Sequence, residues 1–262
     1  MQPLEIFLIL CLGHLAADFL LQTHALVARK KRGLPSAYVH HGLIHYLAVA
    51  AIALLAAPSL FLHARFQAVA LALTAVHVAV DWLKIRVARL PRISDGARLF
   101  FADQALHLAT IVSATLWYAG LPPTHIWIPL RALQPHREVI LMVLVIYIAS
   151  VFPAGYIIRY LTRSLVGELP HVADQSSQQL QNAGLYIGWL ERTVILIAMA
   201  LHSPAAIGLV LTAKSIVRYQ ELGRSARFVE YFLIGTLLSI ALAMLGGIAL
   251  ARVVGESAAL TL

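Results

Sequence analysis

Eight long apolar segments are the feature that most limits what this chain of 262 residues can fold into. Each is long enough, or nearly long enough, to cross a bilayer, and the connections between them are mostly short. Hydrophobic residues make up 60% of the chain and charged residues only 12%, whereas soluble domains carry about 25% charged residues. We therefore predict an all-α fold, a polytopic bundle of about eight transmembrane helices. The segments are residues 3–27, 38–62, 66–86, 99–120, 138–160, 184–202, 204–219 and 228–250.

The basic residues indicate how these segments cross the membrane. Fifteen of the 20 Lys and Arg residues lie at the ends of the odd-numbered segments or in the connections that follow them: four at the first, five at the third, two at the fifth and four at the seventh. Because basic connections stay on the cytoplasmic side, we predict that both termini face outward. This topology also explains the net charge of +8, so nucleic acid is not an expected partner.

The chain divides into two predicted membrane subdomains. Residues 1–120 form a four-helix subdomain rich in His and Asp, residues 121–137 form an outer loop, and residues 138–262 form a second four-helix subdomain. The single cysteine, Cys11, excludes a disulfide framework and a cysteine-based zinc site. The first residues, MQPLEIF, lack the basic region of a signal peptide, so we expect the first segment to remain in the protein.

Each of the first four segments carries a pair of side chains of the types that ligate metals. The members of each pair are four residues apart, which places them one above the other on one face of a helix. Composition alone would give about 0.5 Asp–His pairs at this spacing, and the chain has three. The predicted metal ligands are His14, Asp18, His41, His45, His77, Asp81, Asp103 and His107.

The predicted topology brings all four pairs to one depth. The first and third segments run inward with their pairs in their later halves, and the second and fourth run outward with their pairs near their starts. An ionised Asp at the bilayer centre costs about 2.5–3.5 kcal/mol on the insertion scale, so three of them need partners. The pattern predicts a site for one or two divalent ions, with zinc preferred over manganese and iron. A web of interhelical hydrogen bonds without metal is the alternative, and Gln22 and His40 are secondary members of the site.

A second polar group occurs toward the inner ends of the last three segments. Its residues suit a pocket for an anion such as phosphate, with basic side chains as donors and acidic side chains that orient them. Ion pairs between helices, and basic side chains that extend to the membrane interface, are the alternative. The residues are Glu191, Arg192, Lys214, Arg218 and Glu230.

Several motifs resemble those of a bacterial family of multi-pass membrane proteins of unknown function, the domain of unknown function 3307. In the first half these are His14-x-x-Ala17-Asp18-Phe19-x-x-Gln22, HHGLIH at 40–45, HVAVDWLK at 77–84 and ADQALH at 102–107. In the second half, IGWLER at 187–192, AKSIVR at 213–218 and EYFLIGTLLS at 230–239 resemble the C-terminal extension of many members. The resemblance implies a bacterial inner-membrane location and supplies no activity. The HxxxD pairs also resemble the zinc site of cation-diffusion-facilitator transporters, and HHGLIH resembles inducible membrane-bound metal-dependent hydrolases.

We interpret the site as that of a metal-dependent enzyme near the cytoplasmic leaflet, a hydrolase of a phosphoester or lipid-linked substrate. Lys84 lies three residues after Asp81 and is expected to neutralise a phosphate, and Gln104 is the second residue predicted to act in catalysis. An iron-dependent oxidase is a variant of this hypothesis. A divalent metal transporter or sensor, and a structural membrane protein stabilised by a His/Asp network, are the alternatives. Membrane lipids are the expected partners in each case.

Overall fold

The chain folds into helices that group into two compact units. The computed structural model describes residues 2–90, 93, 96–122, 137–166, 183–222 and 226–259, and these ranges contain no β-strand. The predicted all-α fold is therefore confirmed. One unit comprises Met1–Val145 and the other Ile146–Leu262. The predicted outer loop at 121–137 lies almost entirely outside the described residues, so the predicted subdomain boundary stays a prediction.

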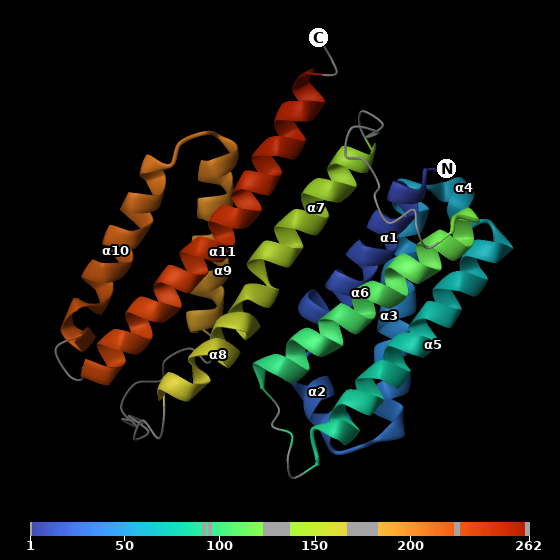
Figure 1. The fold of residues 1–262 in the computed structure, drawn as a ribbon, viewed down its shortest axis with the longest axis horizontal. Helices are drawn as coiled ribbons and strands as arrows, with labels where there is room; N and C mark the ends of the chain where they lie inside the picture. The colour runs from blue at the N-terminus through green and yellow to red at the C-terminus, as the bar shows by residue number, and fades with distance from the viewer. Residues whose placement is uncertain are drawn as a thin grey trace. The chain divides into compact units, whose positions relative to one another are not determined.

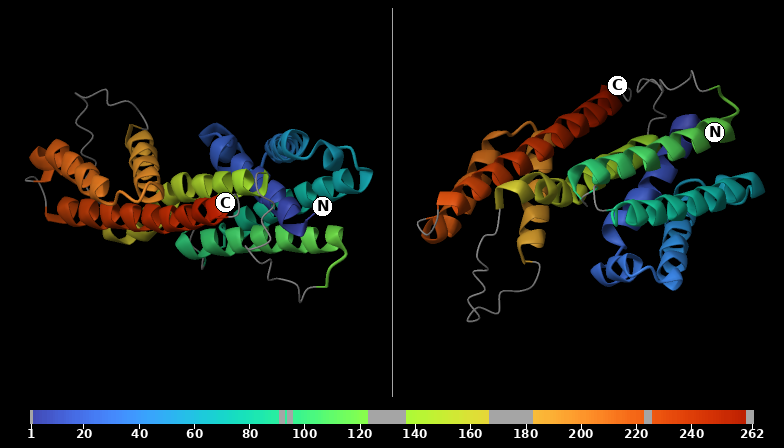
Figure 2. Two further views of the ribbon diagram at one scale, coloured as in Figure 1. Left: turned by 90° about the horizontal axis from the view of Figure 1, so that it is seen from above. Right: turned by 60° about the horizontal axis from the view of Figure 1, so that its bottom comes forward.

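Four long helices form a closed ring in the first unit, drawn in blue to green in Figure 1. The elements of this unit are α1 (Pro3–Leu15), η1 (Ala16–Leu20), α2 (His24–Lys31), α3 (Pro35–Ala56), α4 (Pro58–Phe61), α5 (Ala64–Val87) and α6 (Ala97–Ala119). α1 packs against α3 and α6, and α5 packs against the same two helices, so the four share one core. Figure 2 shows these helices from two further directions.

Local sequence signals set the ends of these helices. Pro3 occupies the first turn of α1, where its missing N–H costs no hydrogen bond. Thr23 caps α2, because its Oγ1 accepts a hydrogen bond from the N–H of Leu26 at 3.2 Å. The first predicted segment, residues 3–27, therefore ends differently from expectation: its long helix stops at Leu20, and the separate helix α2 follows.

Five further helices follow in the described part of the chain, and α11 is the longest of them. They are α7 (Arg137–Val151), α8 (Pro153–Val166), α9 (Ala183–Ala200), α10 (Ala205–Leu222) and α11 (Ala226–Ala259). In the second unit α11, red in Figure 1, packs against α8 and α9, and α10 lies against α9. α7 and α8 are separated at Phe152 by the proline that begins α8, because proline cannot continue the hydrogen-bond pattern of the preceding helix.

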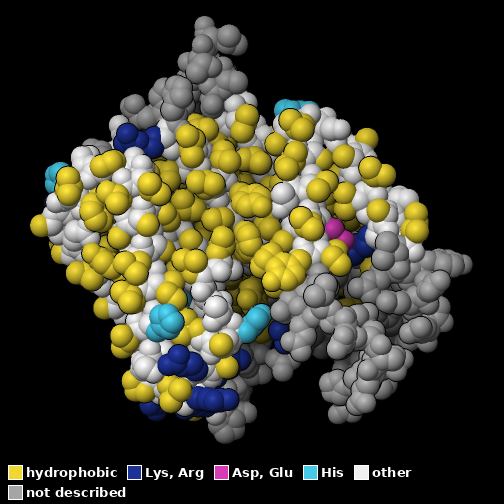
Figure 3. Space-filling model, turned by 180° about the vertical axis from the view of Figure 1, so that it is seen from behind, with side chains coloured by type: hydrophobic (Ala, Val, Ile, Leu, Met, Phe, Trp, Pro, Cys, Tyr) yellow, Lys and Arg dark blue, Asp and Glu magenta, His cyan; other side chains and the backbone are white. Residues whose placement is uncertain are grey.

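The exposed surface of the described residues suits lipid. Large hydrophobic side chains such as Leu55, Leu62 and Leu209 are 84%, 78% and 72% exposed. Figure 3 shows hydrophobic side chains over much of the described surface, with Lys and Arg in small groups. Six helical stretches are long and apolar enough to cross a membrane, namely Pro3–Leu20, Pro35–Ala56, Ala64–Val87, Ala97–Ala119, Arg137–Thr162 and Val229–Gly255. These features indicate a membrane protein.

Two of the eight predicted spans are not among these six stretches. Segment 184–202 forms α9, and segment 204–219 forms α10, of which Ala205–Ile216 is a shorter apolar helix. The total of eight spans and the outward direction of both termini therefore stay predictions.

A close approach of α1 and α3 at Gly13 generates the first testable prediction. A Cβ atom on Gly13 would lie 3.0 Å from the Cα atom of Val49 and closer still to its side chain. We expect Gly13→Ala to lower the free energy of unfolding by about 1–3 kcal/mol, because overpacking forces the two helices apart. Thermal unfolding of the purified protein in detergent measures this change. Gly208→Ala is the matched control, since a Cβ there meets nothing within 4 Å; equal stability of the two variants would contradict the close packing.

Candidate metal centre

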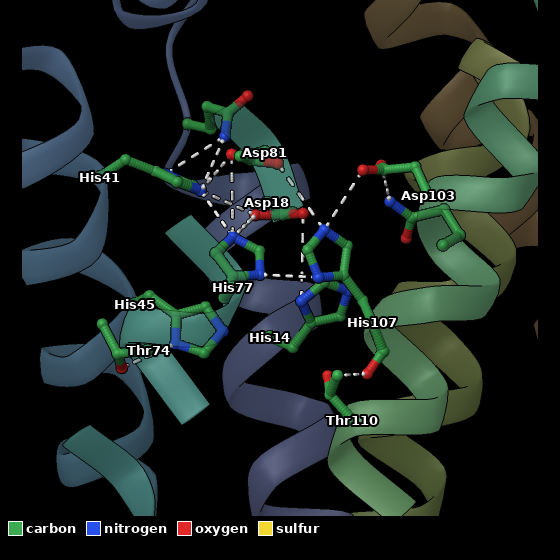
Figure 4. A network of polar contacts seen from close by, with 12 residues as sticks. His14, Asp18, His41, His45, Thr74, His77, Asp81, Asp103, His107 and Thr110 are labelled. Atoms are coloured by element: carbon green, nitrogen blue, oxygen red, sulfur yellow. Dashed lines mark hydrogen bonds and ion pairs between the residues drawn. The ribbon is translucent and has the colours of Figure 1, made fainter. Parts of the chain in front are cut away.

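The four pairs of His and Asp side chains meet in the core of the first unit. α1 with η1, α3, α5 and α6 each contribute one pair, and Figure 4 shows the side chains pointing toward one another from these helices. The structure thus brings together all eight residues that the sequence singles out as ligands. We call them the His/Asp cluster: His14, Asp18, His41, His45, His77, Asp81, Asp103 and His107.

Two layers, one helical turn apart, make up the His/Asp cluster. The deeper layer takes one imidazole from each helix, from His14, His45, His77 and His107. The other layer contains the three Asp residues and His41, and it is nearer the end of the ring where α2 and the α5–α6 connection lie, at the bottom of Figure 1. This end, here called the basic end, carries Arg29, Arg86 and Arg89. The i, i+4 spacing and the antiparallel order of the helices together produce this layering.

Asp18 lies on a π-helical turn, η1, rather than on a regular α-helix. The N–H of Leu21 donates to the carbonyl of Ala16 at 3.0 Å, which is an i to i+5 hydrogen bond. On this turn, Oδ1 of Asp18 lies 3.1 Å from Nε2 of His41 on α3. Turns of this kind occur frequently at functional sites. The spacing in the sequence predicts only an α-helical pair, so the π turn is a feature that the structure adds.

Three ligand atoms meet at a first convergence point, formed by Asp18 Oδ1, His41 Nε2 and His77 Nε2. Asp18 Oδ1 is 3.1 Å from His41 Nε2 and 3.3 Å from His77 Nε2, and the two nitrogens are 2.9 Å apart. A tetrahedral zinc ion at its usual ligand distances separates neighbouring ligand atoms by about 3.4 Å. The three atoms are therefore close to the spacing that one bound ion requires.

A second convergence point is formed by His107 Nε2, Asp103 Oδ1 and Asp81 Oδ1. The nitrogen of His107 is 3.4 Å from the Asp103 oxygen and 3.6 Å from the Asp81 oxygen. His14 lies beside both points, with its Nδ1 3.9 Å from Asp18 Oδ2, and it forms a third group of ligand atoms with His77 and His107.

Four atoms at or beside these points have no hydrogen-bond partner within the described part of the chain and make only the ion-pair contacts of 3.1–3.9 Å given above. They are His14 Nδ1, Asp18 Oδ1, Asp103 Oδ1 and His107 Nε2, and all are buried. A buried polar atom without a partner costs about 1–3 kcal/mol. A cation at each convergence point would satisfy the two carboxylate oxygens and the His107 nitrogen at once. The donor set and its unpartnered atoms therefore fit a divalent metal.

Donors from outside the cluster hold the remaining carboxylate oxygens. Lys30 Nζ donates to Asp81 Oδ2 at 2.5 Å, and Lys84 Nζ donates to Asp103 Oδ2 at 2.8 Å. The amide of Gln104 also donates to Asp103 Oδ2, at 3.0 Å. Each of these two carboxylates thereby turns its other oxygen toward the second convergence point. Hydrogen-bond donors of this kind fix the orientation of the side chains that ligate a metal.

The predicted members of the site differ in how closely they approach it. Gln22 touches the cluster, with its amide nitrogen 3.2 Å from both ring nitrogens of His41. His40 is exposed on the surface of α3 and lies outside the cluster. His45 stands apart from both convergence points: its Nδ1 is 3.2 Å from Thr74 Oγ1 and its ring stacks on that of His77 at 4.3 Å. His45 is therefore placed to support His77 rather than to bind an ion directly.

Lys30 is the member that sequence reasoning missed. It belongs to the basic connection after the first segment, where the predicted topology alone accounts for its charge. In the structure it is 4% exposed, and α2 buries it together with Leu26, four residues earlier. The spacing from Leu26 does not set Lys30 apart in the sequence, because Lys31 likewise lies four residues after the apolar Val27.

The predicted anion-binding residues of the second unit have partners within the protein. Arg192 is buried, and its Nε donates to the carbonyl oxygen of Val151, the last residue of α7, at 2.8 Å. Its Nη1 also donates to Ser239 Oγ at 3.3 Å. A carbonyl at a helix end lacks an intrahelical partner, and lipid supplies none. Arg192 therefore completes the hydrogen bonding at the break between α7 and α8.

The other members of this predicted pocket are more dispersed. Lys214 Nζ donates to Glu191 Oε2 at 2.6 Å, which is an ion pair between α10 and α9. Glu230 is exposed at the start of α11, and the side chain of Arg218 lies outside those that the structure describes. These contacts favour the alternative of ion pairs between helices over an anion pocket.

The buried pair of Lys30 and Asp81 generates the second prediction. We expect Lys30→Met to lower the free energy of unfolding by about 3–5 kcal/mol, because it leaves a buried carboxylate without its ammonium partner. Thermal unfolding after removal of divalent ions with a chelator measures the loss. Arg32→Met, at an exposed position just beyond α2, is the control. The double variant Lys30→Met/Asp81→Asn should recover part of the loss; a single variant as stable as the control would contradict the contact.

Comparison with known proteins finds one family match, which lies within the first unit. Residues 6–129 match the model described as "Protein of unknown function (DUF3307)", and this match includes the whole His/Asp cluster and Lys30. The matched residues end before the second unit, so its predicted identity as the extension of that family stays a prediction. No curated protein and no solved structure matches the chain. Residues 6–129 therefore carry the match to DUF3307, an uncharacterised domain family, and this match covers somewhat less than half of the chain.

Proposed function

We propose that the His/Asp cluster is a divalent metal centre in a protein of the bacterial inner membrane and that it hydrolyses a phosphoester or lipid-linked substrate. One observation carries the proposal: three ligand atoms converge at each of two buried points, and atoms at both points lack another partner. Imidazole and carboxylate donors suit zinc, manganese and iron, and zinc is the first choice.

The number of protein ligands favours catalysis over a purely structural metal. Structural zinc sites use four protein ligands, whereas catalytic sites use three and leave a position for water or substrate. Each convergence point has three protein ligands. A bound metal ion supplies a nucleophilic water near neutral pH and polarises a phosphoryl oxygen. The donors Lys30, Lys84 and Gln104 keep the carboxylates in place for this chemistry.

The charges of the cluster favour an anionic substrate. Three Asp carboxylates and the two ammonium groups of Lys30 and Lys84 leave a net charge of minus one when the imidazoles are neutral. One divalent ion changes this to plus one, and an unbalanced charge inside an apolar bundle is costly. A phosphate group would offset it. Lys84, whose side chain is 24% exposed, is the ammonium best placed to meet such a group.

The basic end is the side from which we expect the substrate to approach. Gln22 and Lys84 there are only half-buried, whereas His45 and His107 in the deeper layer are each 1% exposed. Because basic connections stay in the cytoplasm, this end would face the inner leaflet and its phosphate headgroups. A lipid-linked phosphate could then reach the cluster without crossing the membrane.

The core on the other side of the cluster disfavours a metal transporter or sensor with access from both faces. Transport by alternating access needs a route to the site from each side of the membrane. Toward the opposite end, the ring core includes Ile9, Val49, Phe66 and Ile111, all apolar and buried. An ion leaving in that direction would have to cross this apolar packing.

A structural hydrogen-bond network is the second candidate function. The ion pairs of Lys30 with Asp81 and of Lys84 with Asp103 already balance two of the three carboxylates without metal. The third carboxylate, that of Asp18, instead has its Oδ1 3.1 Å from His41 Nε2 and 3.3 Å from His77 Nε2. Metal content therefore separates the two candidates.

Elemental analysis of the detergent-purified protein tests the metal centre. We expect wild type to retain zinc, manganese or iron at near-stoichiometric level and Asp18→Ala/Asp81→Ala to lose it, because both carboxylates face the convergence points. His40→Ala is the control, since this exposed imidazole precedes His41 on the same helix. Wild type that holds no metal after supplementation would leave the structural network as the function.

Phosphate release by metal-loaded protein tests the hydrolase, with p-nitrophenyl phosphate and with vesicles containing phosphatidic acid as probes. We expect Lys84→Met to keep its metal and to lower kcat/KM by about 100-fold, the typical effect of removing one charge-stabilising donor. Arg86→Met is the control at the same end of the bundle, because Arg86 lies over the Trp82 ring at 4.8 Å and outside the cluster. A metal-loaded wild type that releases no phosphate from either probe would rule out this activity for these substrates.

A further inference from the structure

We infer that the His/Asp cluster holds two divalent ions, one at each convergence point, and that the carboxylate of Asp81 bridges them. This inference rests on the proposed metal centre and adds to it the number of ions and the ligands of each. The first ion has Asp18, His41 and His77 as its ligands, with Oδ2 of the bridging Asp81 as a fourth. The second has Asp103, His107 and Asp81, so the position for water or substrate lies at the second ion.

The separate donor sets of the two points argue for two ions. The first point uses Asp18 Oδ1 with Nε2 of His41 and of His77, and the second uses oxygens of Asp81 and Asp103 with Nε2 of His107. No atom belongs to both sets. An ion at the first point would satisfy Asp18 Oδ1 but would leave Asp103 Oδ1 and His107 Nε2 buried with only their mutual contact at 3.4 Å. A second ion removes that cost.

Asp81 has the geometry of a bridge. Its Oδ1 lies 3.6 Å from His107 Nε2 at the second point, and its Oδ2 lies 3.4 Å from His41 Nε2 at the first. One carboxylate therefore presents an oxygen to each point. Two-metal hydrolytic sites hold their ions about 3.5–4 Å apart, a separation that a bridging carboxylate spans. Lys30 also donates to Oδ2, which a carboxylate oxygen permits because it has more than one acceptor position.

The contact between His77 and His107 agrees with two ions. Each ring turns Nε2 toward a different convergence point, and their Nδ1 atoms lie 3.1 Å apart, within hydrogen-bond distance. One ring can therefore donate to the other at Nδ1 while each Nε2 faces its own convergence point.

Manganese loading with two readouts tests the inference. Elemental analysis counts the ions in each chain, and electron paramagnetic resonance distinguishes an isolated Mn²⁺ ion from a magnetically coupled pair. We expect wild type to bind two ions with a coupled signal. Asp103→Asn and Asp18→Asn should each bind one ion with an uncoupled signal, because each substitution removes a charged ligand from one point alone. His40→Ala should retain the coupled pair, and thermal unfolding confirms that each variant is folded.

The outcomes separate this inference from the proposed function. One ion in each wild-type chain, with no coupled signal, would overturn the two-ion centre and leave the metal-dependent hydrolase in place. A coupled pair that survives in folded Asp103→Asn would also overturn the assignment of ligands. Wild type that binds no manganese, zinc or iron would remove both the inference and the function on which it rests.

Discussion

Burying three carboxylates inside an apolar four-helix ring is the constraint on which the first unit depends. An ionised Asp costs about 2.5–3.5 kcal/mol at the bilayer centre, and here all three lie in one core. Imidazoles from the same helices face some of the carboxylate oxygens, and the ammonium groups of Lys30 and Lys84 hold others from the basic end. The oxygens left over converge with His nitrogens. The same arrangement that limits the cost of burial therefore assembles a set of metal ligands.

The second unit meets a similar constraint in a different way. Arg192 is as deeply buried as the carboxylates, but its partners are the carbonyl of Val151, at a helix end, and the hydroxyl of Ser239. These contacts use its donors to complete the packing of α7, α9 and α11. A buried charge is thus not by itself a sign of a binding site. What distinguishes the His/Asp cluster is that several ligand atoms converge and lack other partners.

The candidate site could be predicted from the sequence to the extent that it depends on helical periodicity. Pairs four residues apart identify one face of each helix, and antiparallel order brings those faces to one depth. The same reasoning could not assign roles within the pairs. His45 and His77 each lie four residues from the other member of their pair. Only His77 faces the first convergence point, whereas His45 lies within hydrogen-bond distance of Thr74 and stacks on the His77 ring. Such a difference arises from side-chain packing between helices, which no single segment encodes.

The sequence by itself determined that this chain is all-α and apolar enough for a membrane, because hydropathy is a local property. It also determined that eight His and Asp side chains belong together, because the four-residue spacing within each pair is local as well. The tertiary structure decided three further things. The separate helix α2 brings Lys30 into contact with Asp81, and Asp18 lies on a π-helical turn. The packing of the helices also divides the ligand atoms between two convergence points. Each of these depends on contacts between residues far apart in the chain, or on one turn departing from the regular helix that the spacing predicts.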